Sequence, residues 1–172
     1  MDWRPFAAIV LVCILAFTAY NAPLYSWNYL ALKLFLFIVI PLAFAFIVLK
    51  AKPDDIGFSL KKKRKIIYYL GLVLLVGSPF MIYASQLPEF QAFYPQFHLV
   101  GMQNILLLES FVLLSMLACE FLYRGFLLFS LEKHWGFWPA IVIQAIPYTL
   151  VHIGKPFLEV PYSFLAGFVL GY

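Results

Sequence analysis

Residues 29–49 read YLALKLFLFIVIPLAFAFIVL, and this stretch decides the fold class. Its only charged residue is Lys33. A helix of about 20 apolar residues crosses the ~30 Å hydrocarbon layer of a bilayer. The stretch therefore predicts a transmembrane helix. Lys33 lies near one end of it, so its long side chain is expected to extend toward the membrane surface.

The composition extends this prediction to the whole chain. Of 172 residues, 65% are hydrophobic and 12% are charged, whereas roughly a quarter of the residues of soluble domains are charged. We predict an all-α, polytopic transmembrane helix bundle of about six spans. The last span would measure only about 18 Å. Either the protein ends within a span, or this is the N-terminal part of a longer chain. The expected spans are 5–20, 29–49, 66–86, 104–129, 137–153 and an incomplete one from 161.

The distribution of basic residues predicts the orientation in the membrane. Residues 50–65 contain seven lysines and arginines against two aspartates, and such loops remain on the cytoplasmic side. We therefore expect a multi-pass protein of the cell membrane with a cytoplasmic N-terminus, and with loops 21–28 and 87–103 outside. Membrane lipids are the expected surroundings. Nucleic acid is not an expected partner, because no exposed aromatic residues accompany the basic run.

The predicted span 104–129 carries charges that need an explanation. A charge at the centre of a bilayer costs about 3 kcal/mol on insertion scales, yet this span contains Glu109, Glu120 and Arg124. Glu120 and Arg124 are four residues apart and can pair on one helix face. Glu109 lies three turns earlier on nearly the same face. A structural ion pair is one interpretation, and a functional site is the other.

The following span supplies a matching polar face. Gln144, Tyr148 and His152 recur at intervals of four, so they share one side of a helix. If the chain turns near Trp135, Glu120 and His152 differ in height by only about 3 Å. A carboxylate, a guanidinium and an imidazole can then meet in one layer. Such a group can activate water, bind a metal or relay protons.

Two motifs in this region resemble a known family, the CAAX prenyl protease and bacteriocin-processing (CPBP) intramembrane proteases. The sequence EFLYRGFL (120–127) resembles the family's first motif, Glu-Glu-x-x-x-Arg, and YTLVH (148–152) is similar to its second, Phe-x-x-x-His. GKPFLE (154–159) and the GxxxG pair Gly167 and Gly171 also resemble the family's next segment. We therefore divide the chain into N-terminal transmembrane helices, 1–103, and a CPBP-like catalytic region, 104–172, which stops before the family's third motif.

The resemblance implies an intramembrane endopeptidase that hydrolyses a peptide or a membrane-protein substrate by Glu- and His-activated water. Glu120 would be the second motif carboxylate, Arg124 would fix its charge and orientation, and His152 would hold or polarise the water. Glu159 can substitute for the missing first carboxylate. The family's chemistry has two descriptions, a glutamate-activated water and a metal site. In the second, zinc or another divalent metal would be bound by His152 and Glu120.

One departure from the family pattern opens alternatives. Cys119 stands where the family has its first glutamate. Cys119 could be a nucleophile, although it has no helix N-terminus beside it to lower its thiol pKa. The chain could also be a catalytically impaired relative that acts as a membrane immunity or binding protein. A third alternative is a proton- or ion-coupled transporter with Glu109, Glu120 and His152 as its relay.

Overall fold

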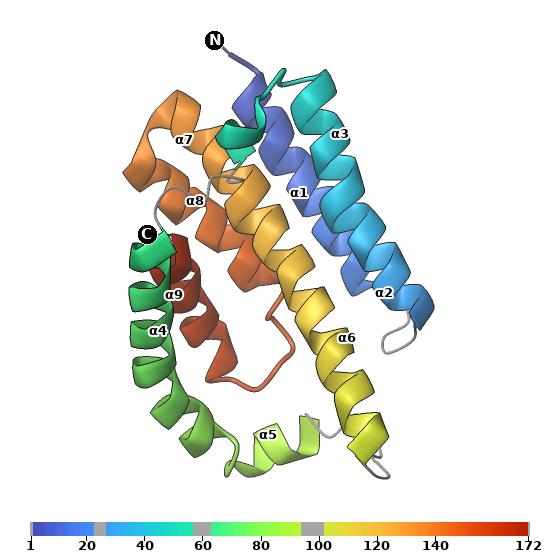
Figure 1. Ribbon diagram of the computed structural model, residues 1–172, viewed down its shortest axis with the longest axis vertical. Coiled ribbons are helices and arrows are strands. Elements are labelled where there is room, and N and C mark those ends of the chain that lie inside the picture. The colour runs from blue at the N-terminus through green and yellow to red at the C-terminus, as the bar shows by residue number, and fades with distance from the viewer. Residues whose placement is uncertain (1, 23–26, 57–62, 94–101, 172) are drawn as a thin grey trace.

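The computed structural model confirms the all-α class (Figure 1). It describes residues 2–22, 27–56, 63–93 and 102–171, and no strand occurs within these ranges. Parts of the predicted loops, residues 23–26, 57–62 and 94–101, lie outside the described residues. The elements are α1 (Arg4–Tyr20), α2 (Trp27–Leu34), η1 (Phe35–Val39), α3 (Ile40–Ile47), η2 (Pro53–Ile56), α4 (Lys63–Ala84), α5 (Pro88–Phe93), α6 (Met102–Glu120), η3 (Phe121–Leu128), α7 (Phe129–Trp135), α8 (Phe137–Leu150) and α9 (Glu159–Gly171).

Two of these helical stretches are long and apolar enough to cross a membrane, Asn28–Ile47 and Leu106–Trp135. The first comprises α2, η1 and α3, and the second consists of α6, η3 and α7. Helices α1 and α8 are apolar but shorter. All six predicted segments form helices, whereas the predicted count of about six membrane spans stays a prediction.

Both long helices contain a π-helical segment. In the first, the N–H of Ile40 donates to the carbonyl of Phe35, five residues back. Pro41 follows directly, and a proline has no N–H to continue the regular ladder. The second segment, η3, carries Arg124. Single π turns inside α-helices are frequent at functional sites. The π segment that bears Arg124 is therefore a candidate part of such a site.

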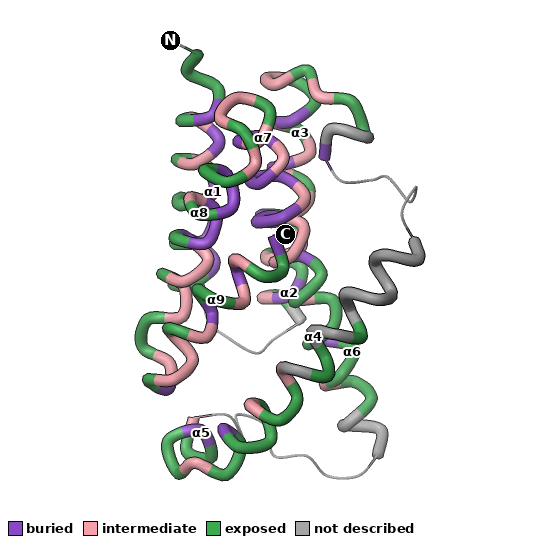
Figure 2. Tube along the Cα trace, turned by 90° about the vertical axis from the view of Figure 1, so that its left-hand side faces the viewer, coloured by how far each residue is buried: buried purple, intermediate pink, exposed green. Residues whose placement is uncertain are grey.

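The core lies at the end of the molecule where α1, α3, η3, α7 and α8 meet (Figure 2). Ala8 and Val12 of α1 are fully buried there, as are Leu127 and Ile141 from the C-terminal half. Figure 2 shows that α5 is mostly exposed. The segments on either side of residue 103 therefore share one hydrophobic core.

The N-terminus is attached to the end of α7. Asp2 Oδ2 lies 3.0 Å from His134 Nε2, and the rings of Phe6 and Trp135 meet edge to face with centroids 5.1 Å apart. The backbone N–H of Arg4 donates to Asp2 Oδ1. This hydrogen bond is the main cause that lowers the pKa of Asp2, with a smaller contribution from His134.

The structure gives Lys33 partners within the helix bundle. Its ammonium group is turned toward α6 and donates to Ser115 Oγ at 2.6 Å. The same nitrogen lies 5.8 Å and 5.7 Å from the ring centroids of Tyr29 and Phe37. A hydroxyl and two aromatic faces within the bundle therefore stabilise this charge, and its position relative to the membrane surface stays a prediction.

The GxxxG pair brings α8 and α9 close together, as such pairs of small residues do in membrane helices. A Cβ atom on Gly167 would lie 3.2 Å from both Ala145 Cβ and Tyr148 Cδ1. A Cβ on Gly171 would lie 3.1 Å from Gln144 Nε2. This close approach places α9 against the polar face of α8.

We expect Gly167→Leu to destabilise the protein by about 1 to 3 kcal/mol, the usual cost of inserting extra methylenes into a packed interface. Denaturant titration of the protein in detergent measures the effect. Gly71→Leu is the control, because a Cβ at Gly71 meets nothing within 4 Å. Equal stability of both variants would contradict the close packing of α8 and α9.

Candidate active site

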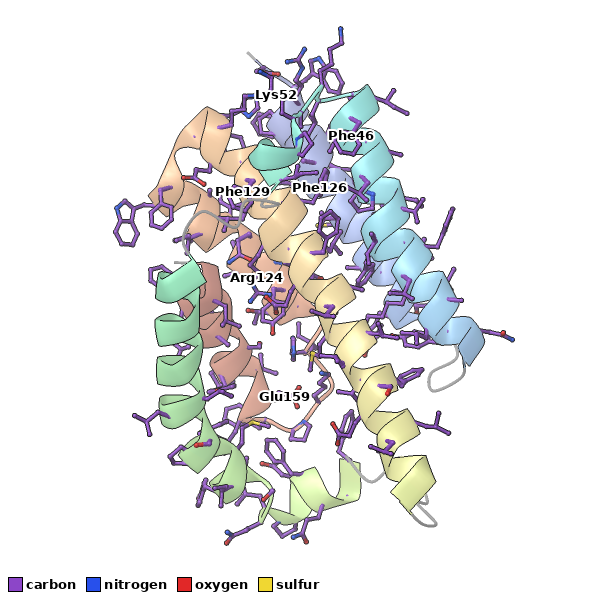
Figure 3. The ribbon with its side chains drawn as sticks, in the orientation of Figure 1. Phe46, Lys52, Arg124, Phe126, Phe129 and Glu159 are labelled. Carbon is purple, nitrogen blue, oxygen red and sulfur yellow. The ribbon has the colours of Figure 1, made fainter. Side chains whose placement is uncertain are left out.

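The first part of the candidate site is an ion pair at the junction of α6 and η3. The Nη1 of Arg124 donates to Glu120 Oε1 at 3.0 Å, which confirms the pairing expected from their spacing. The two side chains differ in burial, with 10% of Arg124 and 40% of Glu120 exposed. Figure 3 shows Arg124 between the α6 helix and the C-terminal helices.

Tyr148 connects this pair to the next helix. The guanidinium carbon of Arg124 lies 4.0 Å from the centroid of the Tyr148 ring, a cation–π geometry that is stronger when the cation is desolvated. The same ring contacts Tyr123 edge to face at 5.3 Å and His152 at 5.0 Å. The aromatic residue of the second motif thus separates the arginine from the histidine and packs against both.

His152 lies beyond the end of α8, which stops at Leu150. The expected span 137–153 is therefore too long at its C-terminal end. His152 belongs to a turn in which its N–H donates to the carbonyl of Thr149. Gly154 continues the turn with φ +92°, a left-handed conformation that glycine adopts at no steric cost. The turn directs the chain back toward α9.

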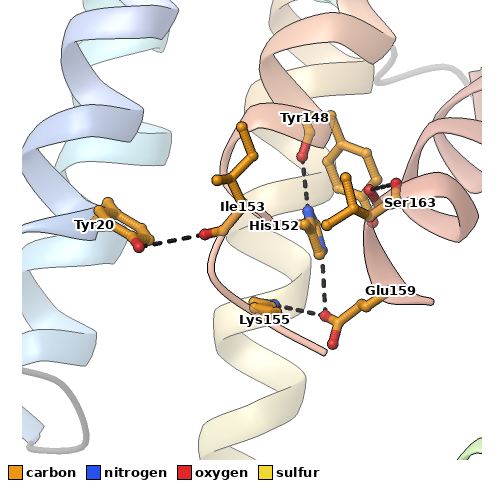
Figure 4. A network of polar contacts seen from close by, with 8 residues as sticks. Tyr20, Tyr148, His152, Ile153, Lys155, Glu159 and Ser163 are labelled. Atoms are coloured by element: carbon orange, nitrogen blue, oxygen red, sulfur yellow. Dashed lines mark hydrogen bonds and ion pairs between the residues drawn. The ribbon is translucent and has the colours of Figure 1, made fainter. Parts of the chain in front are cut away.

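The orientation of the His152 ring follows from its backbone contact (Figure 4). Nδ1 lies 2.8 Å from the carbonyl oxygen of Tyr148. A carbonyl oxygen can only accept, so Nδ1 carries the proton, and in the neutral ring Nε2 presents its lone pair. Nε2 faces Glu159 Oε1 at 3.7 Å. That distance exceeds the range of a direct hydrogen bond.

Glu159 is held by a second cation. Lys155 Nζ donates to Glu159 Oε1 at 2.8 Å, and 15% of the Glu159 side chain is exposed. Glu159 is the first residue of α9, where the partial positive charge of a helix N-terminus favours an acidic side chain. One carboxylate oxygen therefore lies between an ammonium group and an imidazole nitrogen.

The structure brings together some of the residues expected in the site and separates others. Glu120 pairs with Arg124, and His152 approaches Glu159. Among the described contacts, none joins Glu120 directly to His152. The two pairs are connected by the ring of Tyr148, which contacts both Arg124 and His152. Glu109 is exposed on α6, three turns from Glu120, which does not favour a proton relay through all three residues.

Sequence reasoning missed Lys155 as a member of this group. Lys155 and Glu159 are four residues apart, the same spacing that identified the pair of Glu120 and Arg124. That signal was present in the sequence. The spacing alone does not show that the pair lies beside His152, because the turn after α8 brings them together.

The His and Glu side chains of the site are too few and too strongly paired to bind a metal ion by themselves. His152 Nε2 and Glu159 Oε1 converge, but Lys155 occupies the same carboxylate oxygen, and Glu120 is held by Arg124. Within the described residues, no group of three or more His, Cys, Asp or Glu side chains could hold a metal ion. Zinc sites usually have at least three protein ligands. The described side chains therefore do not form a zinc site by themselves.

Comparison with known proteins agrees with the two motifs. Residues 101–172 match the family model described as Rce1-like, type II CAAX prenyl endopeptidase. The searches of curated proteins and of solved structures give no match. The matched segment contains both charged pairs, the turn that bears His152 and helix α9. The segment that carries the Glu120–Arg124 and Tyr148–His152 motifs is thus similar to the Rce1-like CAAX proteases, which is consistent with the resemblance to the CPBP family.

Proposed function

We propose that this protein is an intramembrane endopeptidase that hydrolyses a peptide bond of a membrane-associated substrate with a water activated by Glu159 and His152. One observation carries the proposal. His152 Nδ1–H donates to the carbonyl oxygen of Tyr148, so the lone pair of Nε2 faces Glu159 Oε1 at a distance of 3.7 Å. Two acceptors at this separation suit a water molecule that donates one hydrogen to each.

In the proposed reaction, Glu159 is the general base. It takes a proton from the water while the oxygen attacks the carbonyl carbon of the scissile bond. The proton then passes to the leaving amine as the carbon–nitrogen bond breaks. His152 orients the water through Nε2. Lys155 holds the carboxylate of Glu159 in place through a charge-assisted hydrogen bond.

Glu120 and Arg124 have a supporting role in this proposal. Arg124 holds the carboxylate of Glu120 and packs on Tyr148, so the pair fixes the ring on which the position of His152 depends. Zinc or another divalent metal is the alternative activator, but it would need ligands in addition to His152 and Glu120, which no described contact joins. A chelator would abolish cleavage in that case and would leave a glutamate-activated water unaffected.

Cleavage by the purified full-length protein tests the proposal. The substrate is a peptide with a lipid anchor and a fluorophore on each side of the scissile bond, in phospholipid vesicles that contain the protein. We expect cleavage by the natural protein and a loss of cleavage in His152→Ala. Cleavage that persists unchanged in His152→Ala would contradict the proposal.

Cys119 favours a second candidate function, a family member that binds membrane proteins and has lost its activity. Cys119 occupies the position of the first motif glutamate and is partly buried. We expect Cys119→Ala to retain activity, because Glu159 supplies the base in our proposal. Loss of activity in Cys119→Ala alone would indicate a cysteine nucleophile. A gain of activity in Cys119→Glu over a nearly inert parent would favour the binding function.

We further propose a cytoplasmic N-terminus, on the strength of the basic residues in segment 50–65. Single-cysteine variants at Ser26 and Ser59, made in a background without Cys13 and Cys119, report the two sides of the membrane. A membrane-impermeant maleimide is expected to label position 26 from outside and position 59 from inside. Labelling of both positions from one side would overturn this orientation.

A further inference from the structure

The proposed general base, Glu159, lies in the first turn of helix α9. It is the first residue of α9, and its N–H donates to the carbonyl oxygen of Pro156 at 2.8 Å. Tyr162 follows three residues later, about one turn along the same helix. A contact that fixes the ring of Tyr162 therefore also restrains the backbone that carries the Glu159 carboxylate.

The ring of Tyr162 is held by helix α4. It stacks almost parallel on the ring of Phe80, with centroids 4.2 Å apart and an angle of 10° between the planes. Its hydroxyl lies over Gly77, where an added Cβ atom would be only 3.1 Å from the hydroxyl oxygen. Gly77 and Phe80 are three residues apart, so they share one face of α4. We call these two residues the α4 slot.

The α4 slot is on the side of α4 that packs against the rest of the molecule. Gly77 and Phe80 are partly buried, whereas 73% of Leu75 and 62% of Ile82 are exposed on the other side of the helix. Figure 1 shows α4 beside α9, in agreement with the ring contact. Helix α4 thus presents to α9 the face that accommodates Tyr162.

His152, which faces Glu159, is anchored by a different helix. The hydroxyl of Tyr20 in α1 donates to the carbonyl oxygen of Ile153 at 3.3 Å (Figure 4). This hydrogen bond ties α1 to the turn after α8. The 3.7 Å between His152 Nε2 and Glu159 Oε1 therefore has a support on each side, α1 on the side of His152 and α4 on the side of Glu159.

We propose that Gly77 and Phe80 are positioning residues for the peptidase reaction. The α4 slot holds Tyr162 and thereby keeps the Glu159 carboxylate at the distance from His152 that a bridging water needs. This inference rests on the proposed role of Glu159 as the base. The effect on rate is expected to be large for a contact one turn away, because a misplacement of ~1 Å can cost about 10²-fold.

Phe80→Ala removes one wall of the α4 slot, and Tyr83→Ala is its matched control. Tyr83 lies one turn further along α4 and is 59% exposed. In the vesicle assay, we expect Phe80→Ala to lower kcat by about tenfold, less than the full cost of a ~1 Å misplacement. KM should stay unchanged, because Phe80 acts through Tyr162 and does not bind the substrate. Equal kcat in the two variants would overturn the proposal.

Gly77→Ala tests the other wall of the α4 slot. The added methyl group comes within 3.1 Å of the Tyr162 hydroxyl, so the ring has to shift by a few tenths of an ångström. We expect a loss of roughly threefold in kcat. Tyr162→Phe removes the hydroxyl and should restore kcat when it is combined with Gly77→Ala. A double variant as slow as Gly77→Ala would contradict the slot, since a second substitution does not relieve a general weakening of the fold.

Hydrogen exchange distinguishes this inference from the proposed function. Exchange of the backbone amides of α9 is followed by mass spectrometry on the full-length protein in detergent, without substrate. Phe80→Ala is expected to speed exchange in the peptide that contains Glu159 and Tyr162, whereas Tyr83→Ala is not. Unchanged exchange in Phe80→Ala would overturn the slot even if the natural protein cleaves its substrate. Faster exchange in a protein that cleaves nothing would support the slot and refute the proposed peptidase.

Discussion

Glu159→Gln is expected to lower the rate of peptide cleavage by about 10² to 10⁴-fold, the usual contribution of a general base. Glutamine preserves the shape of the side chain, yet its amide cannot take a proton from water. Its carbonyl oxygen can still accept from Lys155, which lies 2.8 Å from Glu159 Oε1 in the natural protein. The fold should therefore persist. Initial rates in vesicles and denaturant titrations of the same preparations measure the two effects separately.

Glu120→Gln is the matched control for this prediction. Glu120 lies against Arg124, away from the oxygen that faces His152, so its replacement should reduce turnover less than Glu159→Gln does. If Glu120→Gln abolishes cleavage while Glu159→Gln does not, Glu120 is the base. Full activity in both variants would mean that neither carboxylate activates the water, and the mechanism would have to be abandoned.

Arg124→Met is expected to destabilise the protein by about 3 kcal/mol, at the lower end of the cost of breaking a buried ion pair. Methionine keeps much of the side-chain volume but loses the hydrogen bond to Glu120 and the cation–π contact with Tyr148. The cost lies at the lower end because 40% of the Glu120 side chain is exposed, so water can partly solvate the carboxylate left behind.

Arg4→Met is the control for that measurement. Arg4 is exposed at the start of α1, and surface substitutions of this kind change stability by less than about 0.5 kcal/mol. Both variants are unfolded in the same detergent, and their midpoints are compared with that of the natural protein. A midpoint for Arg124→Met equal to that of Arg4→Met would show that the buried pair contributes nothing to stability.

Apolar run length and helical spacing predicted the helices and the pairing of Glu120 with Arg124 correctly. These signals are local: a run of apolar residues specifies a helix, and a spacing of four specifies a shared face. The turn near Trp135 followed from the same reasoning and is confirmed, since α7 ends at Trp135 and α8 begins at Phe137. The close packing of α9 against another helix could also be predicted locally, from the small residues Gly167 and Gly171.

The remaining features depend on contacts between segments, which the sequence does not display. Hydrophobicity alone extended the span to residue 153, whereas α8 ends at Leu150 and places His152 in a turn. The hydrogen bond from Lys33 to Ser115 could not be predicted, because the two residues are 82 positions apart in the sequence. The direction of the His152 ring likewise depends on a backbone carbonyl that no residue type reveals.

The bond from Tyr20 to the turn after α8 bears on how this protein can vary between species. Tyr20 belongs to the part of the chain outside the family match, which begins at residue 101. Helix α1 nevertheless anchors the turn that carries His152. The segment that matches the family model and the segment that folds around one core therefore have different boundaries. Sequence divergence in α1 is then restrained by this anchor and by the shared core. Residues 101–172 transplanted without α1 would lose a support that their own motifs do not encode.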